Sequence, residues 1–194
     1  MINIHTLTLG NYQTNTYIIH DESSSDCAVI DPGYAPEHIM TYLQKNGLHL
    51  EAILLTHGHF DHVGGVKTMA VQTNCRVFLR AEENTMPPMF TAGALYSTDE
   101  YPDRLSIAGL DIMVLHTPGH TPGSVCLLTQ DALFSGDTLF AGSCGRTDLP
   151  GGDWATIHAS LHKLQNLSGD YRVFPGHGET TTLEVERRFN PYLR

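Results

Sequence analysis

Short runs of β-branched and apolar residues, each ended by Gly, Asp or Pro, open the chain. The runs are INIHTLTL, TNTYIIH and CAVID, at residues 2–9, 14–20 and 27–31. Such residues are enriched in strands, whereas Gly, Asp and Pro are typical of turns. The pattern therefore predicts three short strands that begin an antiparallel sheet.

Apolar residues then change to a helical spacing. Between Pro36 and Lys45, the apolar side chains fall at Ile39, Met40 and Leu43, and Asn46-Gly47 supplies a stop. The run AILLT at residues 52–56 follows. Its consecutive apolar residues predict a strand that is covered on both faces.

The same rhythm returns in the second half of the chain. Strands are predicted for NCRVFLR, LDIMVLH, SVCLLT, DALFSGD and YRVFP, and helices for GDWATIHASLHKLQ and for the C-terminal end. Two similar rounds of strands and helices predict two sheets packed face to face with helices outside them, a layered α/β fold. The length of 194 residues fits a single domain, 1–194.

One segment interrupts this rhythm. Residues 84–104 are rich in Pro, Met and aromatic side chains. Two interpretations stay open for it: a loop that covers a substrate, and an irregular segment that only packs against the core.

Charge and composition narrow the function classes. The formal net charge is −10, and Lys and Arg form no dense stretch, so nucleic acid is not an expected partner. The N-terminus lacks a basic and apolar leader, and nowhere do about 20 apolar residues follow one another, so we expect a cytoplasmic protein without a membrane span. The cysteines Cys27, Cys75, Cys126 and Cys144 form no C-x-x-C pair and are expected to be reduced and mostly buried.

The segment HGHFDHVGG directly after AILLT is the densest chemical signal. It places His57, His59, Asp61 and His62 on the loop beyond a strand end, where side chains are held rigidly yet remain open to ligands. Imidazole nitrogen and carboxylate oxygen suit Zn²⁺, Mn²⁺ or Fe²⁺. Because one cation cannot easily use all four donors, the spacing favours two cations side by side.

Further candidate ligands follow other predicted strands. His116 and His120 lie in HTPGHTPGS, Asp137 in FSGDTLF and His177 in FPGHGE, each in a turn after an apolar run. A layered α/β fold can bring such strand ends together. Residue types alone do not choose between His116 and His120.

These motifs, in this order, resemble the metallo-β-lactamase superfamily, and the resemblance extends from the first strands to PGHGETT and NPYL. It implies an αββα sandwich of two mixed sheets. It also implies that His57, His59 and His120 hold a first metal, that Asp61, His62 and His177 hold a second, and that Asp137 bridges them. His116 then becomes a residue at a strand end.

Within the superfamily the chain looks most like glyoxalase II-like hydrolases, the hydroxyacylglutathione hydrolases. The expected reaction is cleavage of a thioester by a metal-bound hydroxide, since metal-bound water can have a pKa near 7. Asp61 is expected to orient that hydroxide, and the implied cofactors are two divalent ions, Zn²⁺ with Fe or Mn as alternatives. True β-lactamases fit less well, because they are exported and lack the bridging Asp.

Several alternatives stay open beside this reading. The chain ends 17 residues after His177, so the C-terminal glutathione-binding region of the longer glyoxalase II enzymes is not expected here. LFAGSCGRTDLPGGDW also resembles persulfide dioxygenases, which use a single iron. A lactonase or another small-ester hydrolase is a further alternative, and a non-enzymatic metal-binding module is the least favoured.

Arg146 is the candidate substrate-binding residue. Its guanidinium can pair bidentately with a substrate carboxylate, or form a surface ion pair with Asp148 or Asp153 instead. Cys144 beside it is interpreted as a packed thiol. His158 and His162 are interpreted as one face of an amphipathic helix rather than as a metal site. A small thioester or thiol-derived molecule is the expected partner, and the sequence does not indicate an oligomeric state.

Overall fold

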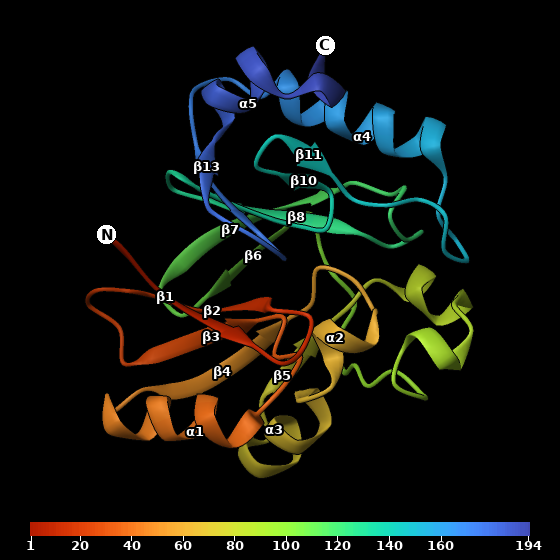
Figure 1. Cartoon of the computed structure of the whole chain (residues 1–194). Helices are drawn as coiled ribbons and strands as arrows, with labels where there is room; N and C mark the ends of the chain where they lie inside the picture. The colour runs from red at the N-terminus through yellow and green to blue at the C-terminus, as the bar shows by residue number, and fades with distance from the viewer.

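Two β-sheets lie face to face between two layers of helices, as Figure 1 shows. The computed structural model describes all residues, 1–194. Both sheets are mixed, because each contains parallel and antiparallel neighbours. The predicted αββα sandwich is therefore confirmed.

The first sheet has the strand order β1-β2-β3-β4-β5. Its strands are β1 (Ile2–Leu9), β2 (Thr14–Asp21), β3 (Asp26–Ile30), β4 (His49–Leu54) and β5 (Arg76–Phe78). The first three are antiparallel, as predicted, and β3, β4 and β5 are parallel. Parallel neighbours need a crossover, and α1 (Pro36–Lys45) supplies the one between β3 and β4.

The second sheet has the order β13-β12-β9-β8-β7-β6. Its strands are β6 (Arg104–Ile107), β7 (Leu110–His116), β8 (Val125–Thr129), β9 (Ala132–Gly136), β12 (Arg172–Pro175) and β13 (Thr181–Thr182). A small hairpin of β10 (Leu139–Phe140) and β11 (Ser143–Cys144) follows β9. Because β7, β9 and β12 run in the same direction, their C-terminal ends meet at one edge.

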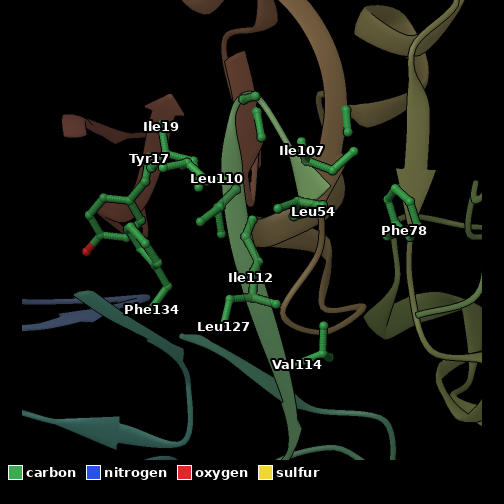
Figure 2. Packing of buried hydrophobic residues seen from close by; sticks show 14 of the residues in the cluster. Tyr17, Ile19, Leu54, Phe78, Ile107, Leu110, Ile112, Val114, Leu127 and Phe134 are labelled. Carbon is green, nitrogen blue, oxygen red and sulfur yellow. The ribbon is translucent and has the colours of Figure 1, made fainter. Parts of the chain in front are cut away.

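Strands buried on both faces explain the continuous apolar runs. In β2, Tyr17 and Ile19 face the second sheet, whereas Ile18 faces the helices, and β4 divides its side chains in the same way. The close-up in Figure 2 shows part of the cluster between the sheets, to which Ile19 of β2 and Leu110 of β7 both belong.

Helices with one apolar face form the two outer layers, because that face packs against a sheet. The first sheet is covered by α1 and α3 (Val66–Thr73), and the second by α4 (Trp154–Gln165) and α5 (Leu183–Phe189), as Figure 1 shows. The predicted bounds of α1 are confirmed. Asp153 caps α4 by accepting a hydrogen bond from the Thr156 amide at 2.7 Å.

Two predicted segments differ from the structure. The strand predicted for NCRVFLR is only three residues long, because Asn74 adopts a left-handed conformation that ends α3 and the chain turns into a 3-10 helix, η1 (Ala81–Thr85). Residues 84–104, which contain η2 (Pro88–Phe90), pack in part against the core, and the substrate-covering role stays a prediction. Tyr101 stacks on Phe78 in the core, whereas Phe90 lines the cavity described below.

The thiols agree with the prediction. All four cysteines are free, three are buried and Cys144 is half-buried. Burial raises the pKa of Cys27 to about 12 and that of Cys126 to about 11, which makes these thiols poor nucleophiles. Every helix is too short or too polar to cross a bilayer.

Candidate metal centre

The loop after β4 carries four of the predicted ligands. His57 and His59 lie on the loop itself, and Asp61 and His62 lie on the short helix α2 (Phe60–Val63) that follows. All four are buried. We call residues 57–62 the metal loop.

The other three predicted ligands come from the second sheet. His120 lies in the turn between β7 and β8, Asp137 follows β9 and His177 follows β12, so all three leave the edge at which these strands end together. The backbone amide of Val125 donates to the Thr56 carbonyl at 2.9 Å, which holds this edge against the metal loop.

The seven side chains gather into two clusters joined by one carboxylate. The ligand atoms of His57, His59 and His120 lie within 4.8 Å of one another, and we call this cluster the first metal position. Those of Asp61, His62 and His177 form the second metal position under the same limit.

Asp137 lies between the two positions. Its Oδ2 is 3.5 Å from His120 Nε2 in the first position and 3.5 Å from His177 Nε2 in the second. Its Oδ1 is 3.5 Å from His62 Nε2. A carboxylate placed in this way can bridge two cations.

The geometry and chemistry of these donors fit divalent cations. Two nitrogen or oxygen donors on a tetrahedral Zn²⁺ lie about 3.3 Å apart, given metal–ligand distances of about 2.0–2.1 Å. In the second position, His62 Nε2 is 3.3 Å from His177 Nε2, and Asp61 Oδ2 is 3.5 and 3.2 Å from these two nitrogens. His57 Nε2 and Asp137 Oδ1 are buried without a hydrogen-bond partner, which is costly unless they have another ligand.

The two positions differ in their protonation. Burial lowers the pKa of all three histidines of the first position, and that of His59 to about 4. In the second position burial acts in the same direction, but Asp137, Asp31 and Asp61 outweigh it and raise the pKa of His62 to about 9. The pKa of His177 is also raised, by its hydrogen bond to Asp61 and by Asp137.

Asp31 is a site residue that the sequence analysis missed. Its side chain accepts hydrogen bonds from the Thr56 amide at 2.8 Å and the Thr56 hydroxyl at 2.6 Å, and its Oδ2 is 2.9 Å from His62 Nδ1. Because these contacts already occupy the carboxylate, Asp31 orients His62 rather than binding a cation itself. The signal in the sequence is an Asp directly after a buried strand, in IDPG.

Backbone carbonyls orient two other histidines. His120 Nδ1 lies 2.8 Å from the carbonyl of Arg146, and His177 Nδ1 lies 3.0 Å from that of Tyr12. A ring nitrogen that donates to a carbonyl leaves Nε2 as the acceptor for a cation. The two Nε2 atoms both face Asp137.

A cavity of about 510 Å³ opens beside both positions. Besides site residues, its lining includes Tyr12, Phe60, Phe90, Phe140, Ser143, Cys144, Arg146 and Leu149. A second cavity, of about 540 Å³, lies between α3 and residues 91–96, but its walls contain no cluster of metal-ligand type. The first cavity is therefore the candidate substrate site, because it combines apolar walls with convergent polar groups.

Arg146 lies at the rim of this cavity and is 60% exposed. Its guanidinium forms a bidentate ion pair with Asp148, at 2.6 and 2.7 Å. The surface ion pair that the sequence left open is thus present. Asp153 is engaged elsewhere, as the cap of α4.

The remaining histidines lie outside both positions. His116 Nε2 is 3.0 Å from the carbonyl of Pro122, so the turn uses its second histidine, His120, in the cluster. On α4, His158 packs edge-on against Trp154, and His162 contacts Asn166. Neither forms part of a group that could hold a cation.

Known proteins with similar sequences cover nearly the whole chain. The hydroxyacylglutathione hydrolase GloC of Haemophilus influenzae is 34% identical, over 99% of this chain and 98% of its own length. A hydroxyacylglutathione hydrolase of Pseudomonas savastanoi is 38% identical over 93% of this chain, which spans 67% of that longer protein.

Solved structures agree in fold. The BLEG-1 B3 metallo-β-lactamase matches with a TM-score of 0.90 and 36% identity, over 100% of this chain and 99% of its own. The protein TTHA1623, solved in a di-iron-bound form, matches with a TM-score of 0.86 and 37% identity, over 97% and 100% of the two chains.

The model of the metallo-beta-lactamase superfamily matches residues 9–177, which include every side chain of the two metal positions and Asp137. The match therefore covers most of the chain and its whole candidate site. The chain belongs to the metallo-β-lactamase superfamily.

Proposed function

We propose that this protein is a metal-dependent hydrolase that cleaves thioesters of the hydroxyacylglutathione type. The observation that carries the proposal is the pair of donor clusters, buried except for the half-buried His177, that Asp137 joins beside an open cavity. The similarity to hydroxyacylglutathione hydrolases supports the choice of substrate.

In this proposal the two clusters hold two divalent cations. His57, His59 and His120 would hold the first, Asp61, His62 and His177 would hold the second, and Asp137, which lies between the two clusters, would be shared by both. The cations would supply an activated water and polarise the acyl carbonyl. Zinc suits these nitrogen and oxygen donors, and the di-iron form of TTHA1623 supports iron as the alternative.

The protein's own residues orient the reactants. Asp61 is held by a hydrogen bond from the Thr14 hydroxyl at 3.1 Å and by His177, so it can direct the attacking water. The aromatic walls of the cavity exclude water from the bound thioester. No general acid is needed for the leaving group, since a free thiol has a pKa of about 8.5 and departs as the thiolate.

Arg146 is proposed to bind a carboxylate of the substrate. It can do so by exchanging its exposed partner Asp148 for the substrate, because a surface ion pair contributes only about 0–1 kcal/mol. Arg146→Ala should raise KM for a glutathione thioester by about tenfold without loss of metal, a change that corresponds to about 1.4 kcal/mol. Steady-state kinetics and metal counting test this, and an unchanged KM would remove Arg146 from the site.

One set of measurements tests the proposed reaction. Zinc and iron are counted per chain, and hydrolysis of S-D-lactoylglutathione is compared with oxygen uptake in the presence of glutathione persulfide. We expect thioester cleavage that is lost with a chelator and restored by metal. One iron per chain with oxygen uptake and no thioester cleavage would instead establish the dioxygenase alternative.

Opening of β-lactams is a second candidate function. The similarity to the BLEG-1 B3 metallo-β-lactamase, at 36% identity, favours it more than the sequence motifs alone did. A chromogenic cephalosporin assayed beside the thioester separates the two. We expect kcat/KM to be higher for the thioester.

A further inference from the structure

A buried carboxylate outside the ligand set lies beneath the metal centre. Glu83 belongs to η1, which follows β5, and its exposed fraction is 0%. It takes part in no ion pair, since the neighbouring Arg80 pairs with Glu82 instead. A buried carboxylate without a basic partner is costly, so its hydrogen bonds must account for its place.

Glu83 joins two loops that come from different sheets. Its Oε2 accepts a hydrogen bond from the Gly58 amide at 2.6 Å, and its Oε1 accepts one from the Gly123 amide at 2.7 Å. Gly58 stands between His57 and His59 on the metal loop, and Gly123 closes the turn that begins at His120. One carboxylate thus spans the two segments that make the first metal position.

The fit is tight on both sides of the carboxylate. A Cβ atom added at Gly58 would lie 2.9 Å from Oε2, and one at Gly123 would lie 2.8 Å from Oε1. Any larger residue would therefore push the carboxylate away from the amides. Burial raises the pKa of Glu83, and hydrogen bonding from the Thr121 side chain and from the two glycine amides opposes that rise, as expected if these bonds offset the cost of a buried charge.

We propose that Glu83 is a positioning residue that fixes the distance between the metal loop and the His120 turn, and so sets the geometry of the first metal position. The inference rests on the proposed metal centre but not on the choice of thioester as substrate. It predicts a larger effect on the first position, because both segments that Glu83 joins supply ligands to that position. The second position takes only Asp61 and His62 from the metal loop and its third donor, His177, from the end of β12.

Two variants separate the role of the length of the Glu83 side chain from the role of its charge. Glu83→Gln keeps the length of the side chain, but the NH₂ group of its amide would face one of the two backbone N–H donors and could not accept a hydrogen bond from it. Glu83→Asp keeps the charge but is one methylene too short to reach both glycines. Glu186→Gln is the matched control, because Glu186 is also buried and accepts from a glycine amide, that of Gly142 at 2.8 Å, away from the histidines.

Zinc affinity is measured with a competing chelator in full-length chains that retain one position each. His177→Ala isolates the first position and His57→Ala the second. In the first background, both Glu83 variants should weaken zinc binding by about tenfold, within the range of roughly 10–100-fold for outer partners of metal ligands. In the second background the weakening should be clearly smaller, and the Co²⁺ absorption spectrum should change more for the first position than for the second.

The control variant should affect folding but not metal binding. Glu186→Gln should lower the Tm without changing zinc affinity at either position. Unchanged first-position affinity in Glu83→Gln, equal weakening of both positions, or full affinity in Glu83→Asp would overturn the positioning role. If the unsubstituted chain bound no metal, the proposed function would fall as well, so the two failures are distinguishable.

Discussion

The two metal positions are built alike but charged differently. Each takes two donors from the metal loop and one from the second sheet, and Asp137 touches both. The first consists of histidines whose pKa values are lowered, whereas the second contains Asp61 and histidines whose pKa values are raised. The first is therefore ready for a cation at neutral pH, while the second must exchange protons for one.

The largest expected effect comes from the group that the positions share. Asp137→Asn keeps the shape but removes the bridging charge, so both positions should weaken. The hydrolytic kcat should fall by more than the roughly 10–100-fold that is typical of outer partners. The control is Asp131→Asn, since Asp131 forms an exposed ion pair with Arg172. Equal activities of the two variants would contradict a bridging role.

Single-histidine variants should separate the positions. His57→Ala and His177→Ala should each lose about one metal equivalent per chain, because each removes one donor from one cluster. Metal analysis after dialysis measures this, and His116→Ala serves as the control outside the clusters. If either variant lost all of its metal, the positions would have to be treated as one cooperative unit.

The pH dependence should differ between the positions. A histidine with a raised pKa is protonated at neutral pH and must lose that proton before it can bind zinc. Below that pKa, each such proton lowers metal affinity by about tenfold per pH unit. In the His57→Ala chain, zinc affinity should therefore fall steadily as the pH drops below about 9, the raised pKa of His62. In the His177→Ala chain it should fall less, because the remaining histidines have lowered pKa values. Identical slopes of zinc affinity against pH in the two chains would contradict this difference between the two positions.

The smallest of these effects is expected from Asp31→Asn. The change weakens the partner of His62 Nδ1, so the second position should lose about tenfold in zinc affinity. The control is Asp26→Asn at the exposed start of β3, the strand that Asp31 follows. An effect confined to the first position would contradict this assignment.

Much of the site could be predicted because its chemistry is local in sequence. The spacing of His57, His59, Asp61 and His62 is visible on one loop, and strands with both faces buried leave continuous apolar runs. The choice of His120 over His116 needed the resemblance to the superfamily, since both lie in similar turns. The roles of the seven ligands and of Arg146, and the single domain 1–194, stay predictions.

The residues that were missed act across the fold. Asp31 reaches His62 only because β3 and β4 are parallel neighbours, and Glu83 joins loops that are 65 residues apart between Gly58 and Gly123. In sequence, AEEN has the appearance of a polar surface segment, so nothing there distinguishes the buried Glu83 from the half-buried Glu82. Such positions depend on tertiary structure, which a local pattern does not contain.

Because every metal position draws donors from both sheets, bound cations would act as a removable cross-link in a chain whose cysteines are all free. Each occupied position would stabilise the native state by about 2.7 kcal/mol when the free metal concentration is about 100 times Kd. The resistance of the protein to heat and proteolysis would then follow the supply of metal around it.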